Sequence, residues 1–246
     1  MITGGTRGLG ALLTKHFATT GHKVVMNYRN EESANQNMLE ISKLCSTEQV
    51  LALKADVRNR KDVQQMFGKA IEKFGCINVL INCAGINRDS PFLELTDEDW
   101  DSVVDTHLKG TFICSQEFVR HNTTNSGCII NLGAACGIQG RVNGANFCSA
   151  KGGVLAITKC MARELAPRIR VNCLTPSAVD TEEVRERYSL DTPEGLKKVL
   201  AGIPMGRLGA HKDVIHMVES ILGANFTTGE NFFVNGGEYM LSLIHI

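Results

Sequence analysis

Short apolar runs rich in β-branched residues alternate along this chain with longer stretches in which apolar residues recur at helical spacing. The runs predict strands at 23–28, 50–55, 79–82, 128–132 and 170–174, and the longer stretches predict helices at 9–20, 31–44, 60–74, 96–121 and 145–166, with a last helix from about 211. The strands are apolar throughout, as is typical of parallel strands covered by helices on both faces. The pattern therefore predicts an α/β protein with a doubly wound parallel sheet of about seven strands.

A single domain over residues 1–240 is the simplest organisation, because no repeat or linker interrupts the alternation. The segment 180–207 mixes charges with prolines and glycines and has no clear period, which favours a mobile lid or substrate loop. Only Met1 and Ile2 precede the first glycine-rich turn, so we expect a truncated first strand. The last six residues, 241–246, back-translate to a transposon-end adaptor, so we expect a non-native tail there, with an apolar tail at an interface as the alternative.

Composition excludes several classes of partner. The 246 residues carry 26 Lys and Arg against 26 Asp and Glu, so net charge favours neither nucleic acid nor an anionic membrane surface. No apolar run approaches the roughly 20 residues of a membrane span. The 9 cysteines form no CxxC pair, which indicates reduced thiols, no metal site, and a cytoplasmic or organelle-matrix location.

A glycine-rich turn spans residues 3–10, where the first strand passes into a helix. Glycine lets a pyrophosphate approach the backbone, and the unpaired N–H groups at the start of the helix bind an anion. The turn therefore predicts a Rossmann-type dinucleotide site. The residues expected to contact the cofactor are Gly4, Thr6, Arg7, Gly8, Leu9 and Gly10.

The end of the second strand predicts which cofactor is bound. An acidic residue at this position would pair with free ribose hydroxyls, whereas this chain has Asn27 and Arg29 there. Arg29 and Arg7 would place two guanidinium groups near one ribose, which favours the 2′-phosphate of NADP(H) over NAD(H). The alternative is that Arg29 is a solvated surface charge.

Over residues 1 to about 237 the chain resembles the classical short-chain dehydrogenase/reductase family, and within it the 3-oxoacyl-acyl-carrier-protein reductase branch. The matching motifs are TGGTRGLG, Asp56-Val57, Asn82-Cys83-Ala84-Gly85, Ser149-Ala150-Lys151, Pro176 to Thr181 and Val234-Asn235-Gly236-Gly237. The resemblance implies a tetramer that reduces a carbonyl group, such as that of an acyl thioester. It also implies further cofactor contacts from Asp56, Val57, Asn82, Ala84, Gly85, Lys151, Pro176, Val179 and Thr181.

The resemblance fails at the catalytic tetrad. The family's Asn, Ser and Tyr fall on His107, Ala134 and Phe147, and only Lys151 is retained. In the family the Tyr hydroxyl protonates the carbonyl oxygen, the Ser hydroxyl hydrogen-bonds it, and the Asn holds a relay water. Phe147 and Ala134 supply neither group, so we expect conventional reductase activity to be lost while cofactor binding persists.

The sequence also leaves other functions open. An active oxidoreductase would need a rewired proton donor, either His107 as imidazolium or a water molecule. The chain could also run a different chemistry, or serve as a non-catalytic subunit beside an active paralogue in a homo- or hetero-tetramer. Acyl-carrier docking near the active-site entrance would use arginines such as Arg120, Arg168 and Arg170.

Overall fold

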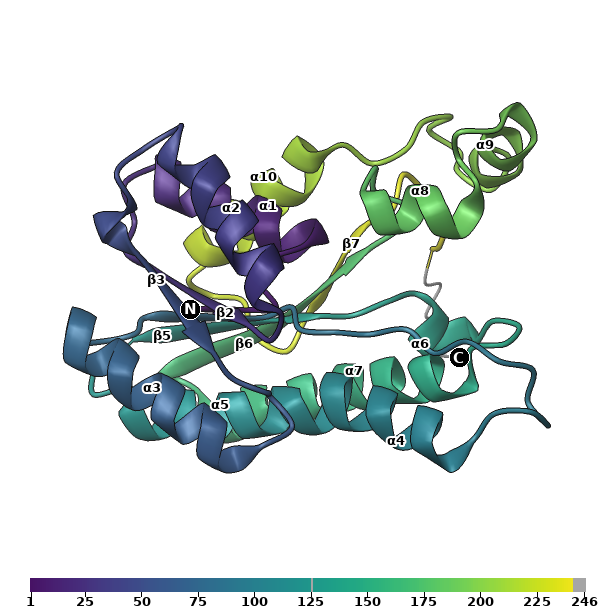
Figure 1. Cartoon of the computed structure of the whole chain (residues 1–246). Coiled ribbons are helices and arrows are strands. Elements are labelled where there is room, and N and C mark those ends of the chain that lie inside the picture. The colour runs from purple at the N-terminus through teal and green to yellow at the C-terminus, as the bar shows by residue number, and fades with distance from the viewer. Residues whose placement is uncertain (125, 241–246) are drawn as a thin grey trace.

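The computed structural model describes residues 1–124 and 126–240. Within these ranges seven parallel strands form one sheet in the order β3-β2-β1-β4-β5-β6-β7 (Figure 1). The strand order changes direction between β1 and β4, where the half of the sheet formed by β1, β2 and β3 meets the half formed by β4 to β7. The predicted α/β fold with a doubly wound parallel sheet is confirmed.

Most elements begin and end within two residues of the sequence expectation. The strands are β1 (Ile2–Thr3), β2 (Val24–Tyr28), β3 (Val50–Lys54), β4 (Val79–Asn82), β5 (Gly127–Leu132), β6 (Ile169–Pro176) and β7 (Asn231–Val234). The helices are α1 (Gly8–Thr19), α2 (Glu31–Ser42), α3 (Arg60–Phe74), α4 (Asp97–Val104), α5 (Gly110–His121), α6 (Cys136–Gln139), α7 (Ala145–Leu165), α8 (Glu182–Tyr188), α9 (Pro193–Leu200) and α10 (His211–Gly223). The periodicity did not place β7, which is only four residues long and half-buried.

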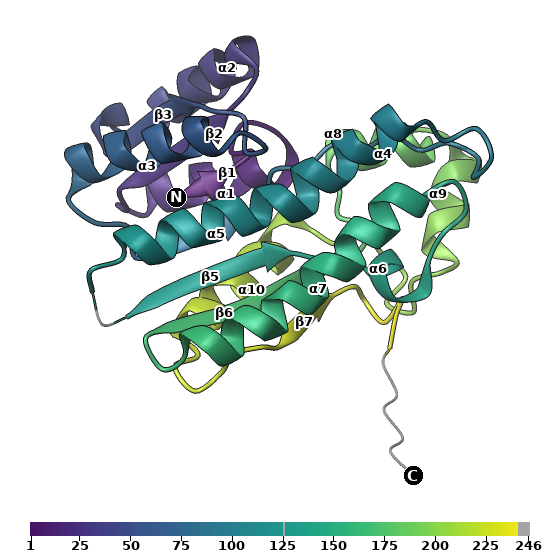
Figure 2. The ribbon, with the colours of Figure 1, turned by 90° about the horizontal axis from the view of Figure 1, so that it is seen from below.

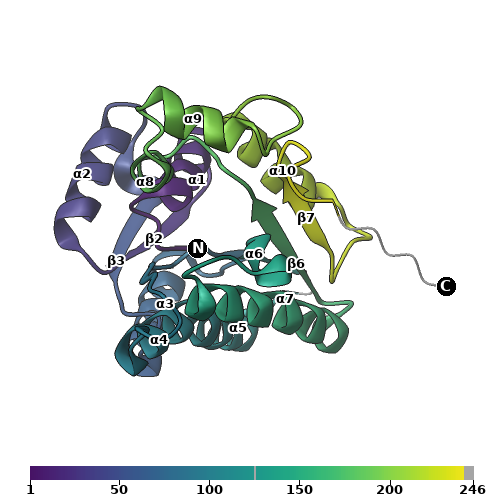
Figure 3. The same cartoon turned by 90° about the vertical axis from the view of Figure 1, so that its right-hand side faces the viewer.

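Helices cover both faces of the sheet, as Figures 1 and 3 show. On one face α1, α2 and α10 pack over an apolar cluster that includes Leu13, Ile41 and Val218. On the other face α3, α5 and α7 enclose a second cluster around Phe67 and Phe118. Among the described residues, no helix is long and apolar enough to cross a membrane.

The first strand is short but fully buried. Ile2 pairs with β2 on one side and β4 on the other, so two residues hold the centre of the sheet. The Met1 amino group donates to Val79 O at 2.8 Å, and burial lowers the pKa of that amino group to about 5. Whether the natural strand is longer stays a prediction, and the expected foreign tail at 241–246 lies outside the described residues.

The helix expected over 96–121 is interrupted. Between α4 and α5 the residues Asp105–Lys109 form a π-helical turn, so the prediction of one regular helix was wrong. The hydroxyl of Thr106, within this turn, donates to Ser102 O, and that of Thr111, just after it, donates to His107 O. Such turns insert one residue into a helix and are frequent at functional sites. Apolar spacing does not reveal an inserted residue, and this turn contains His107.

The segment 180–207 is more regular than expected, because it contains the short helices α8 and α9. The Thr181 and Thr192 side chains cap these helices by accepting hydrogen bonds from Val184 N and Gly195 N. Each threonine is followed within two residues by a glutamate, a helix-start signal that the sequence interpretation overlooked. A lid role for this segment stays a prediction.

Candidate active site

The functional residues expected from the sequence gather at the carboxyl ends of the strands. In Figure 2 the arrow of β5 points toward the end of the molecule where α6 and α9 lie. Loops leaving β1, β4, β5 and β6 meet at this edge, together with the π-helical turn and the start of α7. In open α/β sheets ligands bind at this edge, next to the point where the strand order reverses.

The glycine turn between β1 and α1 fits a dinucleotide phosphate. Gly4 has φ +62°, and a side chain there would lie 2.7 Å from Ala84 Cα, so only glycine lets the turn pack against the loop after β4. Gly8 has φ +51° and faces open space. No side chain caps the start of α1 at Arg7, so its first N–H groups stay available for an anion.

The structure at the end of β2 corrects the role expected for Asn27 at the cofactor ribose. Asn27 is buried, where its Nδ2 donates to Ala55 O at 3.0 Å and its Oδ1 accepts from Gly4 N at 3.2 Å. Asn27 therefore supports the glycine turn instead of offering its side chain to a ribose. Arg29 and Arg7 are both exposed, as a phosphate contact requires, and that contact stays a prediction.

Asp56 and Val57 lie directly after β3. The Arg58 guanidinium donates to both carboxylate oxygens of Asp56, and this pairing holds the pKa of Asp56 below its usual value. Arg29 also lies close enough to lower that pKa. Val57 is buried against Gly110 of α5. The adenine contact expected of these residues is untested.

The loop after β4 is held by buried polar groups. Thr3 Oγ1 accepts hydrogen bonds from the N–H groups of Cys83 and Ala84, which ties this loop to β1. Asn82 Nδ2 donates to Ser115 Oγ at 3.1 Å and to Asn131 Oδ1 at 2.9 Å. The Asn82 side chain thus joins β4 to β5 and α5, so a cofactor contact at this turn would fall to the backbone around Ala84 and Gly85.

Lys151 of α7 is buried beneath the site. Its Nζ donates to Leu132 O at 2.6 Å, and burial lowers the pKa of the ammonium group. The Phe147 ring lies one turn earlier on α7, with its centroid 5.6 Å from Lys151 Nζ. Ala134 follows β5 just before α6. Lys151 therefore lies beside the ring of Phe147, a position that carries no hydroxyl.

His107 packs edge-on against Phe147, with ring centroids 5.0 Å apart. Its Nε2 lies 2.8 Å from Ile86 O and 3.1 Å from Ile86 N, while its buried Nδ1 has no hydrogen-bond partner in the described part of the chain. Burial, reinforced by the positive charge of Lys151, lowers the pKa of His107 to about 3. This shift favours a neutral imidazole near pH 7 and argues against the imidazolium expected as an alternative proton donor.

Two thiols lie beside the substituted positions. Cys136 begins α6 and Cys148 follows Phe147, and the two thiols lie close enough for Cys148 to contribute to the raised pKa of Cys136. Burial raises the pKa of Cys136 to about 12, which keeps this thiol protonated and unreactive. A role in packing accounts for Cys136.

The loop after β6 carries the last group of expected cofactor residues. Val179 is buried, and its N–H donates to Ser177 O at 2.8 Å within a tight turn after Pro176. The Thr181 hydroxyl serves as the cap of α8. Ser177 Oγ donates to Glu238, whose carboxyl pKa is raised by burial. Contact with a nicotinamide carboxamide stays a prediction for this loop.

Several residues at the mouth of the site were missed by sequence reasoning. Arg141 stacks on Phe147 with its Cζ 4.8 Å from the ring centroid, and its Nη2 donates to Asp89 at 2.5 Å. Asn87 Nδ2 donates to Glu183 of α8 at 2.6 Å, which ties α8 to the loop after β4. Arg141, Asp89 and Asn87 lie in polar loops, and no local pattern in the sequence links them to Phe147 or α8.

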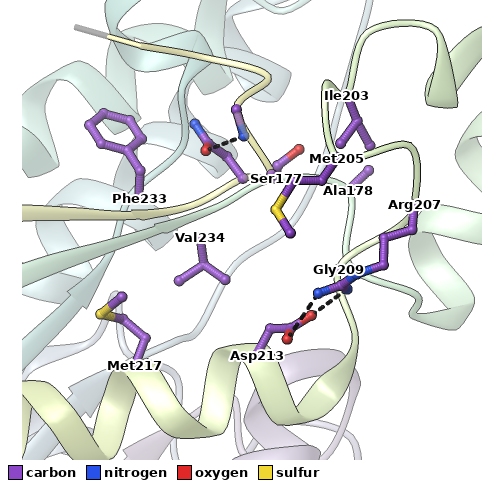
Figure 4. Close-up of a pocket in the computed structure, with 13 residues that line it drawn as sticks. Ser177, Ala178, Ile203, Met205, Arg207, Gly209, Asp213, Met217, Phe233 and Val234 are labelled. Atoms are coloured by element: carbon purple, nitrogen blue, oxygen red, sulfur yellow. Dashed lines mark hydrogen bonds and ion pairs between the residues drawn. The ribbon is translucent and has the colours of Figure 1, made fainter.

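A separate pocket of about 340 Å³ opens where β6, the α9–α10 connection, α10 and β7 meet (Figure 4). Apolar side chains such as Met205, Met217 and Val234 point into it, and an ion pair between Arg207 and Asp213 at 2.7 Å closes one side. Neither Phe147 nor Lys151 contributes to its lining. The pocket is therefore distinct from the tetrad positions.

The arginines expected at the active-site entrance lie elsewhere. Arg168 and Arg170 precede and begin β6, at the amino ends of the strands. Arg170 donates to Ile221 O and Leu222 O in the last turn of α10, and Arg168 donates to Asn122 O. Arg120 pairs with buried Glu117 on α5. The expectation was wrong for Arg168 and Arg170, because the strand direction places them away from the site.

The fold and the glycine turn define a Rossmann-type dinucleotide-binding protein. A family model described as short chain dehydrogenase matches residues 1–190. The chain is 33% identical over 244 residues to the 3-oxoacyl-[acyl-carrier-protein] reductase FabG of Staphylococcus aureus (strain Mu50 / ATCC 700699), covering 98% of this chain and 97% of that protein. It is 34% identical to a 3-oxoacyl-[acyl-carrier-protein] reductase of Synechocystis, covering 98% of this chain and 96% of the relative. The chain belongs to the short-chain dehydrogenase/reductase family.

Solved structures agree with this assignment. A short-chain dehydrogenase/reductase from Brucella melitensis, described as a glucose/ribitol dehydrogenase, superposes with a TM-score of 0.88 at 28% identity, covering 98% of this chain and 96% of that one. A short chain dehydrogenase from Bacillus anthracis superposes with a TM-score of 0.86 at 31% identity, covering 98% and 96%. Membership of this oxidoreductase family implies a nicotinamide dinucleotide cofactor and a carbonyl or alcohol substrate.

Proposed function

We propose that this chain binds NADP(H) at the carboxyl edge of its sheet and has lost the conventional carbonyl reduction of its family. One observation carries the proposal: Lys151 is retained and buried beside Phe147, a ring with no proton to give. Ala134 adds no hydroxyl, and His107 is neutral. The lysine that the family resemblance assigns to the cofactor is therefore retained, while the groups that would act on a carbonyl oxygen are missing.

The expected loss of rate is large. Removing a positioned general acid costs about 10²–10⁴ in rate, and removing one oxyanion donor costs about 10²–10³. The two losses do not simply multiply, because groups that act as a unit fail together. Even the smaller loss leaves little conventional reductase activity.

The preference for NADP(H) is supported by charge at the adenosine end of the site. Arg7 borders the glycine turn and Arg29 follows β2, and both side chains are exposed. Asp56, the carboxylate near Arg29, is already paired with Arg58. Arg29 therefore stays free to take a 2′-phosphate, which a guanidinium binds in a planar, two-bond geometry.

The test combines a binding titration with a rescue. NADPH and NADH are titrated by fluorescence, and reduction of an acetoacetyl thioester is then assayed for the parent and for Phe147→Tyr combined with Ala134→Ser. We expect NADPH to bind more tightly than NADH, the parent to show little turnover, and the double variant to gain at least about 100-fold. Phe112→Tyr on the outer face of α5 is the control, because it adds a hydroxyl away from the site.

Two results would contradict the proposal. Parent protein that reduces the thioester at the rate of the rescued variant retains a proton donor, for example a water molecule. Protein that binds neither NADPH nor NADH contradicts the proposed cofactor binding. We also propose the family's tetrameric assembly, as a homo- or hetero-tetramer, and light scattering on the purified chain measures its mass.

A further inference from the structure

The segment 180–207 leaves and rejoins the body of the protein at one place. Asp180 N donates to Gly209 O at 3.0 Å, and Gly209 N donates to Ala178 O at 3.0 Å, so the two ends of the segment are tied together just after β6. Between these ends lies α8, on the opposite side of the sheet from α6 and α7 (Figure 1). The segment is therefore attached to the body at its base, and α8 needs contacts of its own to stay in place.

Helix α8 is joined to the other side of the site by polar contacts. None of its seven residues, all of which the structure describes, is buried. Asn87 Nδ2, in the loop after β4, donates to Glu183 Oε1 at 2.6 Å. Burial lowers the pKa of Lys151, and the Glu183 carboxylate lies close enough to oppose that shift. The helix therefore lies near the retained lysine without a buried apolar side chain to anchor it.

Asp89 connects α8 to the α6–α7 connection. Its Oδ1 accepts from Arg141 Nη2 at 2.5 Å, and its Oδ2 lies 3.8 Å from Arg187 Nη2 of α8. Arg141 is held against α7, because its Cζ lies 4.8 Å from the Phe147 centroid. Glycine at 144 leaves room for it, since a side chain there would lie 2.5 Å from Arg141 Nε. One carboxylate thus lies between two guanidinium groups, one on the body and one on α8.

We propose that Asp89 is an electrostatic latch that holds α8 closed over the site, and that loss of its ion pair with Arg187 opens the site to a ligand. Both side chains of this pair are partly exposed, so the pair contributes little stability and opens readily. Without the negative charge of Asp89, the guanidinium groups of Arg141 and Arg187 would repel each other. The inference rests on the proposed function only where it concerns the release of NADPH.

Amide hydrogen exchange of α8 tests the latch in the full chain without nucleotide. Asp89→Asn should speed exchange of the α8 amides roughly threefold or more, because an ion pair is lost and a repulsion replaces it. Asp101→Asn is the matched control, since it removes the same charge from an exposed position of α4. If Asp89→Asn does not fold, Arg187→Gln removes the same ion pair from α8 and should also speed exchange.

The salt dependence of this exchange gives a second test, by its sign. Raising the salt concentration from about 0.01 M to about 1 M shortens the Debye length from about 30 Å to about 3 Å. In the parent, salt screens the attraction between Asp89 and Arg187, so α8 should exchange faster. In Asp89→Asn, salt screens the repulsion between Arg141 and Arg187, so the acceleration should disappear or reverse. An equal acceleration in both proteins would overturn the proposal.

The rate of NADPH release tests whether the latch controls the site. Stopped-flow fluorescence should show NADPH leaving Asp89→Asn roughly threefold faster or more, and leaving Asp101→Asn at the parental rate. Unchanged α8 exchange in a folded Asp89→Asn protein would overturn the latch, and unchanged release beside faster exchange would overturn its control of the site. A chain that binds neither NADPH nor NADH would contradict the proposed function instead, and hydrogen exchange would still decide the latch.

Discussion

Replacing His107 with asparagine should remove a specific part of the pH dependence of stability. The imidazole is buried between Phe147 and the loop after β4, and burial lowers its pKa from 6.5 to about 3. Between about pH 3 and pH 6.5 the imidazole therefore binds a proton in the unfolded chain but not in the folded chain. The stability contributed by neutral His107 is complete above pH 6.5 and is lost progressively as the pH falls toward 3.

The size of the effect follows from the two pKa values. Proton linkage gives a loss of about 2 kcal/mol in the free energy of unfolding between about pH 7 and about pH 5 from His107 alone. Asparagine does not titrate, so the unfolding free energy of His107→Asn should not show this loss on acidification. Other titrating groups, including the Met1 amino group, are common to both proteins and cancel in the comparison.

Urea unfolding at the two pH values provides the assay, and the quantity compared is the change in unfolding free energy with pH. His216→Asn on the exposed side of α10 is the control and should behave like the parent. A parent and a His107→Asn variant that lose the same stability on acidification would refute the reasoning. His107 would then be protonated in the folded protein, and the imidazolium would return as a candidate proton donor.

Three further predictions concern contacts that hold the site and the sheet. Gly85→Ala would push a methyl group into the imidazole of His107, so we expect about 1–3 kcal/mol of destabilisation in urea. The same change should cost less in a His107→Ala background, and equal costs would contradict the contact. Arg170→Met removes hydrogen bonds to two carbonyl groups in the last turn of α10 and should lower the unfolding free energy by about 1–3 kcal/mol, whereas Arg163→Met should not. The free Met1 amino group should make stability rise from about pH 5 to pH 8 by thermal denaturation, because its pKa is lowered from 8.0 to about 5 in the fold. Acetylated protein should lack that rise, and an identical pH profile would show that the amino group is solvated.

The sequence by itself determined the fold and showed which hydroxyl groups the tetrad positions lack. Strand and helix periodicities are local properties, so the five strands from β2 to β6 could be placed within about two residues of their observed ends. The losses at Ala134 and Phe147 were equally visible, because a missing hydroxyl is a property of the residue type. The four residues of β7 are too short a run for a period to show.

Only the tertiary structure decided how the remaining groups behave. The neutrality of His107 follows from its burial beside Lys151 and Phe147, which residue type does not reveal. Asn27 looks like a ribose ligand in the sequence but holds the glycine turn in the fold. Arg141 reaches the tetrad position because Gly144 leaves it room. Protonation, hydrogen bonding and packing depend on neighbours distant along the chain, whereas secondary structure depends mostly on neighbours within a few residues.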